Sequence, residues 1–105
     1  MPCALAIRVL ELDDLTVVGL DGDLRAESSR RVATVVEESL ARDVATIVMD
    51  CSLLDTIDEA ASTALGRAAD AVRQHHGRLV MRQPSAEARA VLDLTGTSAV
   101  VEFGD

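Results

Sequence analysis

Hydrophobic residues recur along the chain with two periods, which predict strands and helices in alternation. Aliphatic runs at 4–10 and 15–20 flank the polar segment ELDD, a pattern typical of a β-hairpin. From about Ala26 to Ala41, and again from Asp58 onward, apolar residues recur every three or four positions, which indicates amphipathic helices. Their core-facing stripes are expected to be Val32, Val35, Val36 and Leu40 in the first helix and Ala61, Ala64, Leu65, Ala68 and Val72 in the second.

Three further strands and a third helix complete the pattern. The apolar run at 46–50 is typical of a strand that is covered on both faces. Shorter runs at 78–82 and 99–103 predict two more strands, with a helical segment between them. The resulting order ββαβαβαβ predicts one α/β domain over residues 1–105, with a mixed, mostly parallel sheet and crossover helices.

Capping residues and helix breakers predict where the helices begin and end. Asp23, which follows the breaker Gly22, is a candidate N-cap for the first helix, and Asp58 is one for the second. Cationic or dipolar side chains and a glycine are favourable at a helix C-terminus. We therefore interpret the pair His75 and His76 as residues of a helix end and not as metal ligands. The second helix should therefore end at His75, His76 and Gly77; the third should start at Pro84 and Ser85, bury Val91 and Leu92, and end at Gly96.

The composition narrows the class of partner. The 105 residues carry 18 acidic and 10 basic side chains, a net charge of −8, and a single Phe, Trp or Tyr residue, Phe103. Nucleic acid and anionic membrane surfaces are therefore disfavoured as partners, and base stacking on aromatic side chains is excluded. No membrane span or signal peptide is apparent. We expect a cytoplasmic protein, monomeric or homodimeric, that binds another protein.

Enzyme chemistry finds little support in the sequence. All ten basic residues are Arg, so mechanisms that require lysine are excluded, such as those of phosphate-loop NTPases and Schiff-base enzymes. Asp50 ends a strand as a phosphoacceptor aspartate does, but the lysine of receiver domains and the Asp-x-Asp of haloacid-dehalogenase-type phosphatases are missing. Cys3 and Cys51 do not make a metal or disulfide framework, and Cys51 is expected to be a small buried residue. We therefore expect no catalytic residues, cofactor or metal.

Four acidic residues follow one another closely where the strand at 46–50 leads into the second helix: Asp50, Asp55, Asp58 and Glu59. One interpretation is that they bind a divalent cation together. The other is that Asp58 caps the helix, Glu59 complements the helix dipole and the remaining two are solvated. We favour the second interpretation, because acidic residues are common in the first turns of helices.

Three segments of the chain carry a family resemblance: VVGLDGDL, TIVMDCSLLDTID and HHGRLVMRQPSAEARAVLDLTG. The first is similar to a second strand followed by a Gly-Glu-Leu-Asp turn. The second is similar to a strand ending in Asp-Leu-Ser with a loop that reaches Asp-Ser-Ser-Gly, and the third to a Gly-Gly-x-Leu strand, a Pro-Ser pair and a helix ending in Leu-Thr-Gly. In this order and spacing they resemble a STAS domain, specifically a stand-alone anti-sigma factor antagonist of bacteria. The resemblance covers almost the whole chain.

This resemblance implies a switch based on protein–protein binding. In the family, the unphosphorylated antagonist binds an anti-sigma factor with a histidine-kinase-like ATPase fold and thereby frees the sigma factor for transcription. The anti-sigma factor phosphorylates the second serine of Asp-Ser-Ser-Gly, and the added charge of about −1.5 to −2 releases the complex. Here Asp58 matches the aspartate, but the acceptor position is Ala60, and Arg25 replaces the aspartate of the Gly-Glu-Leu-Asp turn. The resemblance therefore implies the fold of the family without its phosphorylation switch.

Residues around Ala60 allow alternative interpretations. One interpretation of Glu59 is that it partly mimics a phosphate, with about one negative charge where a phosphate carries nearly two. The other is that it is an ordinary acidic residue that stabilises the helix start. We favour the second interpretation. Thr56, Ser62 and Thr63 carry the remaining hydroxyls nearby. A displaced phosphosite at Thr56 or Thr63 is an alternative that the spacing does not support. Ser62 lies in a register that the family fills with Leu, so we expect it to be partly buried.

The partner-binding surface is expected where the Gly22–Arg25 turn meets the loop and helix start at 55–63. An alternative function is a STAS-type accessory subunit that binds the ATPase of a lipid-transport ABC system. A small-molecule sensor is disfavoured, because the chain lacks aromatic residues and a polar cluster at core positions. The residues expected on the surface are Gly22, Asp23, Leu24, Arg25, Asp55, Thr56, Ile57, Asp58, Glu59, Ala60, Ser62 and Thr63.

Overall fold

Strands and helices alternate along the chain after an initial hairpin. The computed structural model describes residues 5–104. In chain order its elements are β1 (Ala6–Glu11), β2 (Leu15–Leu24), α1 (Ala26–Ala41), β3 (Thr46–Ile57), α2 (Glu59–Gln74), β4 (Arg78–Arg82), α3 (Ala86–Leu94), a 3-10 helix (Thr97–Ala99) and β5 (Glu102–Gly104).

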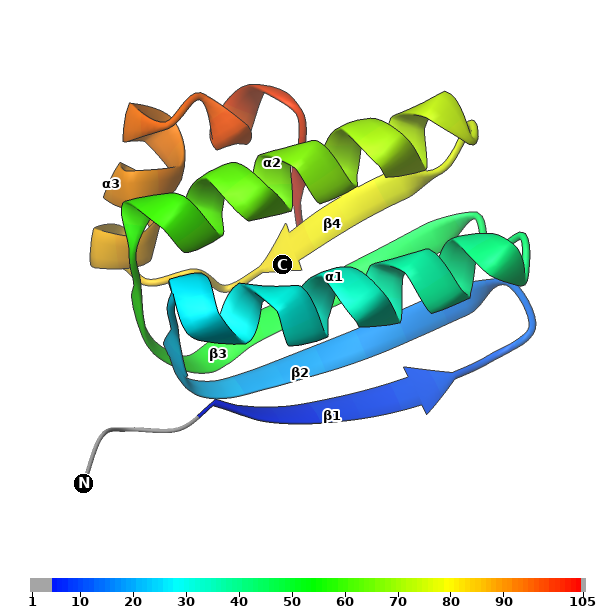
Figure 1. Ribbon diagram of the computed structural model, residues 1–105, viewed down its shortest axis with the longest axis horizontal. Helices are drawn as coiled ribbons and strands as arrows, with labels where there is room; N and C mark the ends of the chain where they lie inside the picture. Colours follow the sequence, from blue (N-terminus) through cyan, green and yellow to red (C-terminus); the bar gives the residue numbers. More distant parts are fainter. Residues whose placement is uncertain (1–4, 105) are drawn as a thin grey trace.

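The five strands form one sheet in the order β1-β2-β3-β4-β5. Strand β1 pairs antiparallel with β2, and every other neighbouring pair is parallel. Helices α1 and α2 lie side by side across one face of this sheet, and α3 lies beside the start of α2 (Figure 1). The predicted α/β fold, with its mixed, mostly parallel sheet and order ββαβαβαβ, is confirmed. None of the helices in residues 5–104 is long and apolar enough to cross a membrane.

The core lies between the sheet and the helices. Alternate residues of the three central strands point toward the helices and are buried: Val18, Leu20, Ile47, Met49, Leu79 and Met81. The helix stripes are buried largely as predicted, through Val32 and Val36 of α1 and Ala61, Leu65 and Val72 of α2. The other predicted stripe residues, Val35, Leu40, Ala64 and Ala68, are half-buried, whereas Ser39 and Ala69 are buried instead.

Strand β3 is longer than predicted. We expected the strand to end at Asp50 and a loop to follow, but β3 continues to Ile57 because the second half of β2, up to Leu24, pairs with it. The pairing survives two register shifts, which fall after Gly19 and after Gly22 of β2. Backbone hydrogen bonds from a neighbouring strand thus outweigh the polar character of the segment. The loop prediction was wrong, and the polar residues of β3 belong to a strand that pairs with β2 through two irregularities of register.

The two ends of the chain also depart from the prediction. The last strand is shorter than expected, because Thr97–Ala99 forms a 3-10 helix and β5 covers only Glu102–Gly104. The first strand, β1, runs from Ala6 to Glu11. The beginning of the segment expected at 4–10 lies outside the described residues, as does Cys3.

The helices end near the predicted capping residues, but after α2 the left-handed position is occupied by His76 and not by the expected glycine. Ser85 is the N-cap of α3, accepting a hydrogen bond from the Ala88 N–H, and Gly96 follows α3 with a left-handed φ of 80°. After α2, His76 and not Gly77 adopts the left-handed conformation, with φ 63°. Gly77 is needed for space, since a Cβ there would lie 2.8 Å from the carbonyl oxygen of Ala45.

Candidate functional site

The N-terminal ends of α1 and α2 lie at the same end of the sheet, where β2 and β3 finish (Figure 1). Asp58 joins them. Its Oδ1 accepts a hydrogen bond from the Ala61 N–H at 2.8 Å, and its Oδ2 accepts one from the Ala26 N–H at 3.1 Å. Its own backbone N–H donates to the Leu24 carbonyl at 3.1 Å. One carboxylate therefore serves the first turns of both helices, and the N-cap predicted for α2 is confirmed.

Asp23, which is buried, also links the end of β2 to the end of β3. The predicted N-cap role of Asp23 is wrong, because β2 runs on to Leu24 and Arg25 becomes the N-cap residue of α1. Asp23 is buried instead, and its Oδ1 accepts a 2.7 Å hydrogen bond from the Thr56 hydroxyl. The Arg25 guanidinium lies 3.7 Å from its Oδ2. The end of β2 is thus tied to the end of β3 through a buried carboxylate.

Ser28 contributes to this site and was not singled out from the sequence. Its hydroxyl oxygen accepts a hydrogen bond from the Arg25 N–H at 2.9 Å, three residues back. This is the reciprocal half of a capping box, with Ser in place of the usual Glu or Gln. The helix start was predicted correctly at about Ala26, but Arg25 is not a usual N-cap residue, so the sequence carried no capping signal at this position.

The predicted surface residues divide into an exposed layer and a buried support. We call the exposed layer the docking surface. It consists of Arg25, Asp55, Thr56, Glu59, Ala60 and Thr63, with the half-buried Gly22 and Asp58 at its margin. Beneath it lie Asp23, Leu24 and Ile57, which are buried and hold the two segments together.

Ser62 is the exception among the predicted surface residues. It is fully buried, so it does not belong to the docking surface, and the expectation of partial burial understated its environment. Its hydroxyl lies 2.7 Å from the Thr95 hydroxyl and 3.3 Å from that of Thr97, whose own hydroxyl donates to the Ser62 carbonyl at 2.7 Å. These contacts fasten α2 to the end of α3, so Ser62 has a structural role.

Ala60 occupies the second position of α2, directly after Glu59, and its side chain is exposed. A hydroxyl at this position would face solvent at a helix N-terminus, where a phosphate is electrostatically favoured. The methyl group of Ala60 has no oxygen to phosphorylate. Residue 60 therefore cannot itself accept a phosphoryl group.

Asp50 does not join the other acidic residues. It alternates with the buried Met49 and Cys51 and so points away from the helices. Its carboxylate accepts a 3.1 Å hydrogen bond from the Ser52 N–H. Hydrogen bonds from the backbone and side chain of Ser52 lower its pKa, with smaller contributions from the positive charges of Arg82 and Arg8. In the part of the chain from residue 5 to 104, no group of three His, Cys, Asp or Glu residues is arranged to hold a metal ion.

Cys51 is a buried residue of β3, as predicted. Its side chain is 1% exposed, and burial, reinforced by the neighbouring charge of Asp50, raises the pKa of the thiol to about 12. The thiolate is the nucleophilic form of cysteine, so this thiol is unsuited to nucleophilic chemistry at neutral pH.

Comparisons with known proteins agree with this architecture. The family model of the STAS domain matches residues 6–105. The structure is similar to that of the unphosphorylated anti-sigma factor antagonist SpoIIAA of Bacillus, at 16% identity, over 97% of this chain and 89% of that chain, with a TM-score of 0.79. It is also similar to an anti-sigma factor antagonist from Mycobacterium paratuberculosis, at 15% identity over 95% and 85% of the two chains, with a TM-score of 0.80.

A serine-to-glutamate variant of RsbS from Moorella thermoacetica is similar to the same degree, at 17% identity over 93% of this chain and 85% of that chain, with a TM-score of 0.78. At such identities, the likeness shows a shared fold. No curated protein matches the chain by sequence.

Proposed function

Because the chain belongs to the STAS domain family, we propose that it is an anti-sigma factor antagonist-like regulator that works without phosphorylation at residue 60. Its partner would be an anti-sigma factor with a histidine-kinase-like ATPase fold, bound through the docking surface. The observation that carries this proposal is the exposed Ala60 at the start of α2, beside a helix start that Asp58 holds in place. In this proposal the partner docks on the same surface, although residue 60 has no oxygen that could accept a phosphate.

The chemistry of the docking surface suits binding better than catalysis. Its exposed side chains include two carboxylates, Asp55 and Glu59, and the small apolar Ala60. With the net charge of −8, these carboxylates favour a partner that presents basic residues. Hydrogen bonds beneath the docking surface connect the end of β2 to the end of β3 and the start of α2. They keep the surface preformed, which lowers the entropy cost of association.

Reconstitution with purified partners tests the proposal. The protein is mixed with candidate kinase-type anti-sigma factors and ATP, and complexes are separated by size and analysed for phosphopeptides. We expect a complex that persists in ATP and contains no phosphate in residues 46–67. Phosphopeptides from this segment would overturn regulation without phosphorylation, and failure to bind any such kinase would overturn the antagonist role.

Surface variants locate the contact. Ala60→Arg should abolish or strongly weaken complex formation, because it places a long cation on the docking surface. Ala41→Arg is the matched control, since Ala41 is exposed at the opposite end of α1. Equal binding by both variants would show that the partner docks elsewhere.

The second candidate is an accessory subunit that binds the ATPase of a lipid-transport ABC system. The exposed Ala60 favours it as well, because such docking requires no phosphoacceptor. Binding assays with a purified ATPase subunit and a purified anti-sigma factor, run in parallel, separate the two functions. Selective binding to the ATPase would replace the first proposal with the second.

A further inference from the structure

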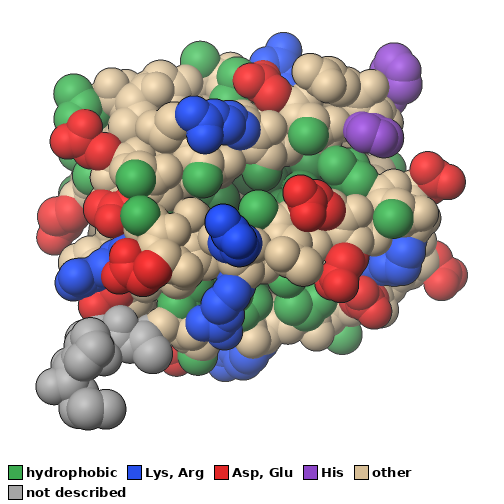
Figure 2. Space-filling view, in the orientation of Figure 1, with side chains coloured by type: hydrophobic (Ala, Val, Ile, Leu, Met, Phe, Trp, Pro, Cys, Tyr) green, Lys and Arg blue, Asp and Glu red, His purple; other side chains and the backbone are tan. Residues whose placement is uncertain are grey.

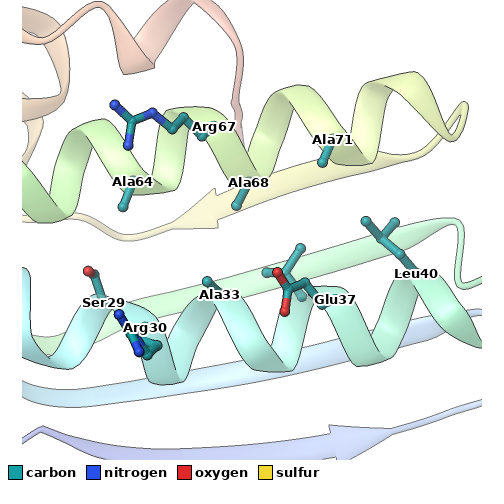
Figure 3. Close-up of a pocket in the computed structure, with 10 residues that line it drawn as sticks. Ser29, Arg30, Ala33, Glu37, Leu40, Ala64, Arg67, Ala68 and Ala71 are labelled. Atoms are coloured by element: carbon teal, nitrogen blue, oxygen red, sulfur yellow. The ribbon is translucent and has the colours of Figure 1, made fainter.

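A groove of about 390 Å³ runs between α1 and α2 on the surface that faces away from the sheet. Figure 2 shows the hollow between the two helices, and Figure 3 shows Ala64, Ala68 and Ala71 of α2 pointing into it toward α1. Its volume falls within the range of about 300–1,000 Å³ that is usual for small-molecule clefts. The apolar side chains that line it are Ala33, Val36, Leu40, Ala64, Ala68 and Ala71.

The groove is long and its lining is mostly apolar; the Ser29 hydroxyl, at one end, donates to the Ala26 carbonyl at 2.8 Å. On the α1 side it extends from Ser29 to Leu40, which corresponds to roughly 16 Å along a helix at about 1.5 Å per residue. Methyl and branched aliphatic groups can contact hydrocarbon but cannot orient a polar ring. The shape and the lining therefore favour an unbranched hydrocarbon chain lying along the helices.

The charged groups of the groove lie on its rims and are distributed unevenly. Arg30 of α1 and Arg67 of α2 line opposite sides near the same end of the groove, and Figure 3 shows each of these exposed side chains lying over its own helix. Within residues 5–104, neither guanidinium forms an ion pair. Glu37 lies farther along α1. Two unpaired cations at one end of an apolar groove are notable in a chain of net charge −8.

We propose that this groove binds a single-chain anionic amphiphile of the long-chain fatty carboxylate type. The carboxylate lies at the end of the groove where the exposed Arg30 and Arg67 side chains can turn toward it, and the hydrocarbon chain runs over the alanines toward Leu40 and Ala71. Glu37 disfavours a second negative charge at the far end, so the ligand carries one anionic end. The site is independent of the docking surface, and its failure would leave the proposed function untouched.

Titration of the full chain with dodecanoate, below its micelle concentration, tests the site. Amide NMR shifts should change along residues 29–40 and 64–71, and calorimetry should give one site. The double variant R30Q/R67Q should bind dodecanoate about tenfold more weakly, the loss expected when charged hydrogen bonds to a carboxylate are removed. R73Q is the matched control, because Arg73 lies on α2 outside the groove, and it should bind as the wild type does.

Two further measurements distinguish this site from nonspecific adsorption. Dodecyltrimethylammonium, with the same chain and the opposite charge, should bind at least about tenfold more weakly than dodecanoate. A68L, which fills the middle of the groove, should abolish the dodecanoate shifts while the rest of the NMR spectrum stays folded. Equal binding of both amphiphiles, or unchanged dodecanoate affinity in R30Q/R67Q and in A68L, would overturn the proposal.

Discussion

The carboxylate of Asp58 lies 3.1 Å from the backbone nitrogen of Ala26, 32 residues earlier in the chain, while its other oxygen caps its own helix through Ala61. One side chain thus accepts hydrogen bonds from backbone N–H groups in the first turns of two helices, which have no acceptor within their own helix. This arrangement fixes how the end of β2 sits against the start of α2. The geometry of the docking surface therefore depends on Asp58, which is itself only half-buried.

Replacing Asp58 should destabilise the fold by more than one ordinary helix cap. Asp58→Ala removes the N-cap of α2 and the acceptor for Ala26, and we expect a loss of about 1–3 kcal/mol in the free energy of unfolding. Asp58→Asn should lie between the alanine variant and the wild type, because its amide keeps one acceptor oxygen. Urea denaturation monitored by circular dichroism measures both.

The exposed Asp55 supplies the control for this prediction. Asp55→Ala also removes one negative charge near the start of α2, yet it should change stability by no more than about 0.5 kcal/mol. If Asp55→Ala and Asp58→Ala lose the same stability, the effect is one of charge and the joint cap contributes little.

The partly buried hydrogen bond between Thr56 and Asp23 should contribute measurably to stability. Thr56→Val keeps a β-branched side chain in β3 and deletes the hydroxyl that donates to the Asp23 carboxylate at 2.7 Å. We expect a loss of about 1–3 kcal/mol, since a buried acceptor loses a donor. Thr63→Val, at an exposed position of α2, is the control and should stay within about 0.5 kcal/mol of the wild type. Denaturation curves that coincide for the two variants would contradict this.

The fold was predictable because its elements depend on local periodicity. The apolar run at 46–50 and the stripe through Leu65 and Val72 indicated a strand and an amphipathic helix, and alternation then required a largely parallel sheet. The expected cover on both faces of the strand was wrong, because only alternate residues such as Ile47 and Met49 are buried. The extension of β3 to Ile57 was not predictable in this way, because it depends on pairing with β2 and not on its own polar sequence.

The meeting of the two segments was predictable, whereas the contacts of their side chains were predictable only in part. The motif around Asp58 indicated where two segments should meet, and they do. The bond from Ala26 to Asp58 spans 32 residues, and the contact that buries Ser62 against Thr97 spans 35, so neither leaves a periodic pattern in the chain. Side-chain roles that rest on such long-range contacts require the structure.

The thiol of Cys51 should be unreactive until the protein unfolds. Burial raises its pKa to about 12, so both access and thiolate formation are suppressed at pH 8. In a Cys3→Ser background, Ellman's reagent should label native protein only slowly, and addition of urea should release one equivalent rapidly. Immediate stoichiometric labelling of the native protein would show that β3 opens readily or that the thiol is accessible.

Asp50 should give the stability a defined pH dependence. Its pKa is lowered in the folded protein, first by the Ser52 hydrogen bonds, whereas an unfolded Asp titrates near about 3.9. The ionised form is therefore favoured by folding, and its contribution is present above the unfolded pKa and is lost as pH falls through the folded pKa. Asp50→Asn should be less stable than the wild type at pH 7, and the gap should narrow below about pH 4.

Urea midpoints at pH 7, 5 and 3 measure this gap. Asp13→Asn, in the exposed turn between β1 and β2, controls for the loss of one negative charge. A gap between wild type and Asp50→Asn that stays constant down to pH 3 would contradict the linkage to this carboxylate.

On the proposed function, introducing a hydroxyl at residue 60 should create a phosphorylation switch. Ala60 is exposed at the second position of α2, so Ala60→Ser should leave the fold intact and present its oxygen to a bound kinase-type anti-sigma factor. With ATP, the variant should acquire one phosphate and leave the complex, because a charge of about −1.5 to −2 then lies within the interface. Ala90→Ser, on the exposed side of α3, should acquire none. Mass spectrometry and complex lifetime report the two events separately. A variant that binds and remains unphosphorylated would show that the partner does not align its ATP with this helix start, and so would separate docking from kinase recognition.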